Sequence, residues 1–220
     1  MFRRDGGDTR VGQPGDVSQN RARIDTISRV MGTIDRLLEV AVSQHGLFTV
    51  EQAASVGVGD AQVRRLASVG TVERRAQGVY RIAAIPFDDR TEFVEAVLWA
   101  KGRALVAGES ALLVWDLADV NPRKIHLVIS PNYRPRRTGA ELYAIHYARV
   151  PDDDRDDLDG VAIVAPARAI EQAIAWGVPG DMIEQAVRRA GAREHIGPST
   201  AQRLRGLLAA RIGRVGARVR

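Results

Sequence analysis

The chain has 220 residues, of which 45% are hydrophobic and none is cysteine, so it can form one large or two small domains but neither disulfides nor thiolate metal sites. Its formal net charge is +5, which permits an acidic partner such as nucleic acid. No apolar run approaches the ~18–20 residues of a membrane span, and the N-terminus lacks the apolar core of a signal peptide, so we expect a cytoplasmic protein with no membrane segment.

Residues 1–25 are predicted to form a disordered tail. The stretch from Met1 to Arg23 is polar, glycine-rich and of mixed charge, a composition that cannot bury enough apolar surface to fold. Apolar residues then repeat at helical spacing and predict a first helix with one apolar face: Ile34, Leu37, Leu38, Ala41 and Val42. The same pattern extends back through Ile24, Ile27 and Met31, so the start of this helix is not fixed by the pattern.

The segment from Gly46 to Ile82 has the order of two short helices followed by a two-stranded ribbon. Thr49 and Gln52 have capping-box spacing at the start of the first short helix. A Gly57-Val58-Gly59 turn leads to the next helix, which runs from an N-cap at Asp60 to a C′ glycine at Gly70. Two β-prone runs, 72–76 and 79–82, flank a tight turn at Gln77-Gly78. Residues 26–85 are therefore predicted to be a winged helix-turn-helix, which places one helix in the DNA major groove.

Arginine is concentrated in the second half of this segment. Between Asp60 and Ile82 there are five arginines against two acidic residues. Arginines on the helix can reach guanine edges, and those on the ribbon suit phosphates or the minor groove. The residues predicted to contact DNA are Gln62, Arg64, Arg65 and Ser68 on the helix, with Arg74, Arg75, Gln77, Tyr80 and Arg81 on the ribbon. A winged helix used only for protein contacts remains an alternative.

Residues 86–213 are predicted to form a second, α/β domain. Helices are expected around 93–100 and 108–117, and again at 166–176, 181–190 and 199–212. Alternation predicts a strand at 125–129, and further strands are expected at 141–148 and 161–164. The predicted class is α+β: a winged helix followed by a small mixed or antiparallel sheet covered by helices.

Charge in this second part is unevenly spread. Six aspartates lie between Asp152 and Asp159, with Arg155 as the one basic residue among them, and this run is expected to be a solvated loop. A basic loop contains Arg134, Arg136 and Arg137, and nine arginines but one acid follow Ala186, ending in a basic tail at 214–220. These basic surfaces could contact DNA or an acidic protein, or could be solvated surface.

The order of features resembles the AbiEi antitoxin family, the antitoxin half of abortive-infection toxin–antitoxin pairs. Three runs carry the resemblance: RRAQGVYRI at 74–82, LVAGESALLVWDL at 105–117 with IHLVIS soon after, and VAIVAPARAIEQAI at 161–174. It covers about residues 34–212. The resemblance implies a DNA-binding domain that represses its own operon, and a C-terminal domain that counteracts a nucleotidyltransferase-like toxin encoded alongside.

No catalytic signature, cofactor motif or metal site is predicted. The four histidines show no metal-ligand spacing, and His126 and His146, on adjacent predicted strands, are expected to be packed or hydrogen-bonded. Ser110 does not lie in a nucleophile elbow, and the Asp152–Asp157 run lacks the glycine and distal glutamate of an EF-hand. The carboxylate spacing of a nucleotidyltransferase is also missing, so the toxin-like chemistry belongs to a partner.

The sequence thus predicts a non-enzymatic, autoregulating antitoxin that binds repeats in its own promoter as double-stranded DNA and counteracts a cognate nucleotidyltransferase-like toxin. One alternative is a stand-alone repressor whose second domain dimerises or senses a ligand. Another is a pure protein-interaction module.

Overall fold

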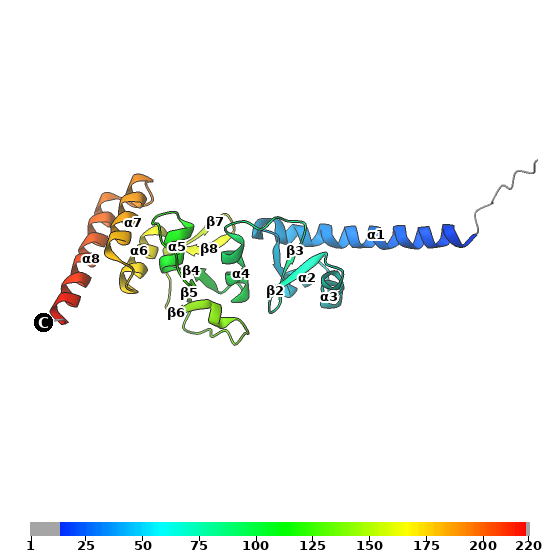
Figure 1. Cartoon of the computed structure of the whole chain (residues 1–220), viewed down its shortest axis with the longest axis horizontal. Coiled ribbons are helices and arrows are strands. Elements are labelled where there is room, and N and C mark those ends of the chain that lie inside the picture. The colour runs from blue at the N-terminus through cyan, green and yellow to red at the C-terminus, as the bar shows by residue number, and fades with distance from the viewer. Residues whose placement is uncertain (1–13, 219–220) are drawn as a thin grey trace, which may run out of the picture.

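The structure, a computed structural model, describes residues 14–218 and is elongated, with a winged helix at one end and a helical layer at the other (Figure 1). The first unit contains helix α1 (Pro14–Ala41), the 3-10 turn η1 (Val42–Gln44), strand β1 (Leu47–Thr49), and helices α2 (Val50–Ser55) and α3 (Asp60–Ser68). Strands β2 (Val72–Ala76) and β3 (Val79–Ile82) complete an antiparallel sheet of order β1-β3-β2.

Helix α1 begins within the segment that the sequence predicts to be a disordered tail. Residues 1–13 lie outside the described part of the chain, but residues 14–25 belong to α1. The sequence between Asp16 and Met31 contains neither glycine nor proline. A helix anchored at its C-terminal end by buried Leu37 and Ala41 continues backward past Gly32 into this stretch.

The local signals of the winged helix are confirmed. The Thr49 hydroxyl accepts the Gln52 N–H at 3.1 Å, and the Gln52 side chain accepts the Thr49 N–H at 2.8 Å, as a capping box requires. Gly70 and Gly78 have φ of +75° and +73°, at the end of α3 and in the wing turn. One detail differs: α3 is capped at Gly59 and not at Asp60, because Gln62 Oε1 accepts the Gly59 N–H at 3.0 Å.

The second unit is a mixed five-stranded sheet with helices around it. Helix α4 (Thr91–Trp99) leads to β4 (Ala104–Val106), α5 (Gly108–Val114), β5 (Ile125–Ile129), the 3-10 turn η2 (Ala140–Leu142) and β6 (Tyr143–Tyr147). The 3-10 turn η3 (Asp152–Asp154) and strands β7 (Arg155–Leu158) and β8 (Val161–Val164) follow, and then α6 (Pro166–Ala175), α7 (Gly180–Ala192) and α8 (Pro198–Arg218). The strand order is β6-β5-β4-β8-β7, with parallel pairs β5–β6 and β4–β8. The predicted α+β class is confirmed.

Two strands of this sheet differ from the sequence-based expectation. Strand β4 is three residues long, too short for alternation to reveal, yet it joins β5 to β8 at the centre. Strand β7 lies inside the acidic run, where a loop is expected, and it pairs Asp156 with Ile163 at the edge of the sheet. Its exposed aspartates fit an edge strand, where charge opposes pairing with another chain.

Two clusters of buried side chains form the interior. One belongs to the winged helix and includes Leu37, Phe48, Val63 and Leu66. The other fills the second unit, and it also contains Leu47 and Val79 from the winged-helix sheet. The two units therefore share apolar packing. The boundaries 26–85 and 86–213 remain a prediction.

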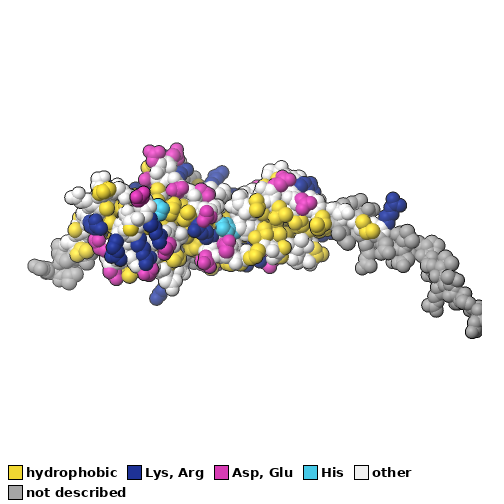
Figure 2. Space-filling model, turned by 90° about the horizontal axis from the view of Figure 1, so that it is seen from above, with side chains coloured by type: hydrophobic (Ala, Val, Ile, Leu, Met, Phe, Trp, Pro, Cys, Tyr) yellow, Lys and Arg dark blue, Asp and Glu magenta, His cyan; other side chains and the backbone are white. Residues whose placement is uncertain are grey.

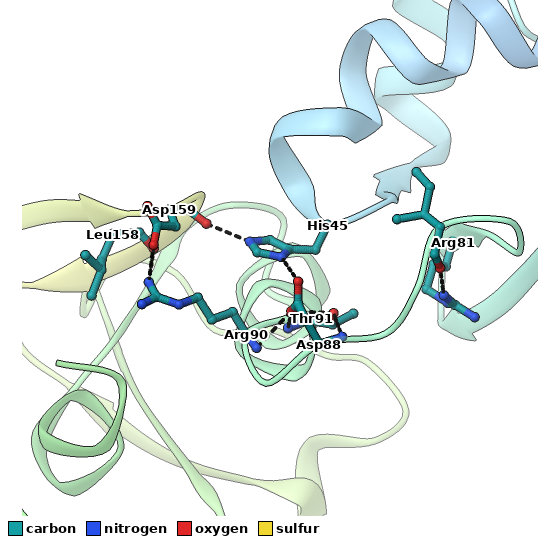
Figure 3. Close-up of polar contacts among 8 residues, drawn as sticks. His45, Arg81, Asp88, Arg90, Thr91, Leu158 and Asp159 are labelled. Carbon is teal, nitrogen blue, oxygen red and sulfur yellow. Dashed lines mark hydrogen bonds and ion pairs between the residues drawn. The ribbon is translucent and has the colours of Figure 1, made fainter. Parts of the chain in front are cut away.

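His45 joins the two units at a polar contact (Figure 3). Its Nδ1 lies 2.6 Å from Asp88 Oδ2, and its Nε2 lies 2.6 Å from the carbonyl oxygen of Asp159. Both partners are acceptors, so only the doubly protonated imidazolium donates to both at once. Arg90 braces the same turn through Asp159 Oδ2 at 2.9 Å and the Leu158 carbonyl at 3.2 Å.

The electrostatics of this contact agree with its geometry. Burial opposes the charge of His45, but the hydrogen bonds to Asp159 and Asp88 outweigh it and raise the pKa of His45 above its usual 6.5. Burial would raise the pKa of Asp88, yet hydrogen bonds from His45, Thr91 and the Arg90 N–H lower it to about 2. Both shifts favour the ionised forms, a protonated His45 beside a charged Asp88.

Gly160 allows the two units to approach closely. It has φ of +80°, and a Cβ placed on it would lie 2.2 Å from the carbonyl oxygen of Ser43. That oxygen belongs to the backbone of the winged-helix unit and cannot swing aside as a side chain would. Only glycine fits here without separating the units.

We expect Gly160→Ala to separate the two units while each keeps its own core. The measurement is small-angle scattering together with limited proteolysis of the connection 83–90. Gly177→Ala is the matched control, because Gly177 has φ of +90° with nothing within 4 Å of a Cβ. Both variants carry about 1–2 kcal/mol of backbone strain, so equal proteolysis of the two would contradict a specific contact at Gly160.

The stability of the contact between the two units should depend on pH, because His45 titrates. A raised folded-state pKa contributes stability that is complete below the unfolded value of about 6.5 and is lost as pH rises through the folded value. Wild type should therefore lose stability relative to His45→Asn as pH rises above about 6.5, since asparagine tolerates the φ of 53° without titrating. Parallel unfolding profiles for the two proteins over this range would refute the assignment.

Candidate nucleic-acid interface

Helix α3 presents a polar face to solvent and an apolar face to the core. Val63 and Leu66 are buried beneath it. The structure places two arginines and two small polar residues on or beside the outer face, as the helical period of 3.6 residues requires: Gln62, Arg64, Arg65 and Ser68. The geometry leaves this face free to enter a groove.

The polar side chains of α3 differ in how far they are engaged. Arg64 forms an ion pair with Asp60 at 2.9 Å, and both side chains are about half exposed or more. Such a surface pair is worth roughly 0–1 kcal/mol, so Arg64 can exchange Asp60 for a phosphate or a base at little cost. Gln62 is partly occupied by capping Gly59. Arg65 has no carboxylate partner among the described residues.

On the wing, one predicted residue faces solvent and another is turned toward the second unit. Arg74 is exposed and makes no ion pair within residues 14–218. Arg75 donates from Nε to Glu95 of α4 at 2.9 Å, and its guanidinium lies 5.3 Å from the ring centroid of Phe87. Arg74 is therefore the wing arginine that stays exposed and unpaired among the described residues, while Arg75 connects the two units.

The tip of the wing is bound by the basic loop. The Gln77 carbonyl oxygen accepts a hydrogen bond from Arg137, and Gln77 Oε1 accepts the Thr138 N–H at 3.4 Å. Arg137 also donates to the Trp99 carbonyl at 2.7 Å. The predicted contacts of Gln77 and Arg137 with an external partner are replaced by a contact between the two units.

Tyr80 and Arg81, both predicted to contact DNA, are instead buried in the structure, which corrects their expected exposure. Tyr80 is 7% exposed and stacks on Phe48 with ring centroids 6.0 Å apart. Arg81 is 8% exposed, and its guanidinium donates to Glu73 at 2.8 and 3.2 Å and to the Ile85 carbonyl. Every residue of the central strand β3 is buried, because both faces of that strand are covered.

The remaining arginines of the basic loop are exposed. The Arg134 guanidinium lies 4.2 Å from the ring centroid of Tyr147, a cation–π contact. Arg136 is exposed and has no ion pair in the described part of the chain. Of the three loop arginines, Arg134 and Arg136 thus stay available to a partner.

The basic C-terminal segment is partly neutralised within the fold. Figure 2 shows arginine side chains interleaved with acidic ones at the end of the molecule formed by α7 and α8. Four ion pairs account for this pattern: Arg189 with Asp119, Arg193 with Asp116, Arg203 with Glu171, and Arg205 with Glu184. The excess of arginine in the sequence therefore overstates the positive field of this surface.

His126 and His146 meet as expected for packed histidines. His146 Nε2 lies 3.3 Å from His126 Nδ1, and the His146 ring stacks on Trp176 at 3.5 Å. Burial lowers the pKa of both, so both are neutral near pH 7. Within residues 14–218 no group of three or more histidine or acidic side chains is placed to hold a metal, and no helix is long and apolar enough to span a membrane.

Comparisons with known proteins agree with the winged helix. Residues 35–83 match the model of a family described as "Transcriptional regulator, AbiEi antitoxin", which confirms the predicted resemblance over these residues. No curated protein sequence matches the chain. The crystal structure of the RV2827C protein from Mycobacterium tuberculosis is similar over 82% of this chain and 77% of that one, with 15% identity and a TM-score of 0.47. This likeness is too distant for individual residues to be compared.

Arg81→Ala and Arg74→Ala should separate a structural arginine from a DNA-contacting one on the same sheet. We expect Arg81→Ala to lower the free energy of unfolding by about 1–3 kcal/mol, because Glu73 and a carbonyl lose their donor. Arg74→Ala should change stability by less than about 0.5 kcal/mol, yet weaken DNA binding and reduce its salt slope by roughly one. Denaturant titration measures the free energy of unfolding, and fluorescence anisotropy measures the DNA affinity and its salt slope. A stable Arg81→Ala with selectively reduced DNA affinity would reverse the correction.

Proposed function

We propose that this chain is a DNA-binding antitoxin of the cytoplasm that represses its own operon and counteracts a nucleotidyltransferase-like toxin, without chemistry of its own. One observation carries the proposal. The exposed arginine face of α3 lies within residues 35–83, the segment matched by a family of AbiEi antitoxin regulators.

DNA binding follows from the chemistry of that face. Arg64 and Arg65 are exposed on one helix, and an arginine fork can bind the O6 and N7 of guanine in the major groove. Arg74 on the wing supplies a phosphate contact that positions the helix. The other four predicted ribbon residues are engaged elsewhere, so the interface we propose is smaller than the full ribbon: Arg75, Gln77, Tyr80 and Arg81.

Toxin contact is proposed for the second unit. A nucleotidyltransferase holds its metals with carboxylates, and such an acidic site attracts exposed guanidinium groups. Arg134 and Arg136 are the exposed arginines of the basic loop, and neither takes part in the Arg137 contact that holds the wing tip. The same pair could extend the DNA footprint, and the two activities can be assayed apart.

The DNA assay compares variants of equal charge. Arg64→Gln/Arg65→Gln should weaken binding to the chain's own promoter repeats by about 1–3 kcal/mol for each arginine that reads a guanine. Arg123→Gln/Arg188→Gln removes the same charge from exposed positions in the second unit and should keep most of the affinity. Equal decreases in both variants would mean that α3 does not read sequence.

The antitoxin assay is growth rescue by the full chain when the nucleotidyltransferase-like neighbour is expressed. Arg134→Gln/Arg136→Gln should reduce rescue and leave promoter repression intact if the loop contacts toxin. If this variant loses repression and keeps rescue, the loop contacts DNA instead. A full chain that represses but never rescues favours the alternative, a stand-alone repressor with a ligand-sensing or dimerising second domain.

A further inference from the structure

A cavity of about 870 Å³ opens on the second unit, away from the winged helix. Its walls are the start of β4, the end of β5, and the segment after β6 that crosses toward β7. Ala104 and Val128 contribute buried apolar floor, while Ser130 and Asn132 contribute polar rim. None of its lining residues belongs to the proposed DNA interface.

The lining is strongly basic. Four arginines face the cavity against the single carboxylate of Asp152: Arg103, Arg149, Arg155 and Arg168. Arg155 is used internally, because it donates to the Val150 carbonyl at 3.0 and 3.1 Å and pairs with Asp152 at 3.4 Å. It thereby fixes the crossing segment that forms one wall.

Two of the exposed arginines, Arg103 and Arg149, have no carboxylate partner among the described residues. Arg149 follows β6 and makes no ion pair within residues 14–218. Arg103 precedes β4, and its guanidinium lies 4.8 Å from the ring centroid of Tyr133, another lining residue. Stacking on an aromatic face holds the guanidinium in place while leaving its N–H groups free to donate.

The third feature is an unsatisfied donor. Arg168 Nε is buried and has no hydrogen-bond partner, although Asp154 Oδ2 lies 3.7 Å away as an ion-pair partner and Glu171 binds Nη1 at 3.1 Å. Buried donors without partners are rare and costly in folded proteins. Arg168 thus adds a further guanidinium to the lining, held beside Asp154 and Glu171.

We propose that this cavity binds the phosphate groups of a nucleotide-sized ligand, with Arg103 and Arg149 as the phosphate-binding residues and Arg168 as a further positive charge in the lining. Guanidinium groups match phosphate oxygens in bidentate fashion. The volume lies within the range of about 300–1,000 Å³ for small-molecule sites, far more than an inorganic anion fills. The phosphate could belong to a free nucleotide or to the end of a nucleic-acid strand.

The test is isothermal titration of the full chain at physiological salt. ATP, GTP, CTP and UTP are the first probes, followed by inorganic phosphate and adenosine. A 5′-phosphorylated and a 5′-hydroxyl oligonucleotide of the same sequence then distinguish a free nucleotide from a strand end. We expect saturable binding of at least one triphosphate or of the 5′-phosphorylated strand, and none of adenosine.

Variants locate that binding. Arg103→Gln/Arg149→Gln should weaken it at least about tenfold, since a charge-assisted hydrogen bond from arginine to phosphate contributes about one decade of affinity or more. Arg123→Gln/Arg188→Gln removes equal charge outside the cavity and should bind as wild type does. Melting temperatures check that both variants fold, which is expected because all four side chains are exposed.

Two outcomes overturn the proposal. One is binding that falls equally in both double variants, and the other is no binding of any phosphate probe by wild type. Neither promoter DNA nor toxin enters the test, so its result is independent of the proposed function.

Discussion

The contact between two left-handed turns determines how the molecule is arranged. One turn contains His45 and Gly46 with φ of 53° and 81°, and the other contains Asp159 and Gly160 with φ of 50° and 80°. They are far apart in sequence, and they meet through the charged His45 ring and the glycine-sized gap over Ser43. Because Leu47 and Val79 enter the core of the second unit beside this contact, the winged helix cannot rotate freely against it.

Short-range signals predicted most of the winged helix. The Thr49–Gln52 capping box, the glycine turns and the spacing of Val63 and Leu66 depend only on residues a few positions apart, and all are present in the structure. The burial of Tyr80 and Arg81 could not be predicted from such short-range signals. Alternation marks a strand covered on one face, but β3 is covered on both, since α-helices lie on one side and the second unit on the other.

Local sequence signals also fail to predict which arginines form basic surfaces. With 32 basic residues, most of them arginine, local counts predict basic patches wherever acids are sparse. In the folded chain Asp119 pairs with Arg189, and Asp116 pairs with Arg193, although the partners are far apart in sequence. The positive charge of the segment after Ala186 is therefore lower than its composition indicates. Conversely, Arg103 and Arg149 are isolated in the sequence and line one cavity because β5 pairs with β4 on one side and with β6 on the other.

The hydrogen-bond and ion-pair partners of each arginine indicate its role better than the number of arginines in a segment does. Arg75, Arg81, Arg137 and Arg155 each bind a carboxylate or a carbonyl and stabilise a wing, a loop or a crossing segment. Among the described residues, exposed arginines without a carboxylate or carbonyl partner include Arg65 on α3, Arg74 on the wing, Arg134 and Arg136 in the basic loop, and Arg103 and Arg149 at the cavity. Since Arg137 also ties the wing tip to the second unit, a winged helix seated on DNA would carry the cavity and the exposed loop in one fixed orientation. Any partner of the second unit would then be held at a defined position relative to the operator.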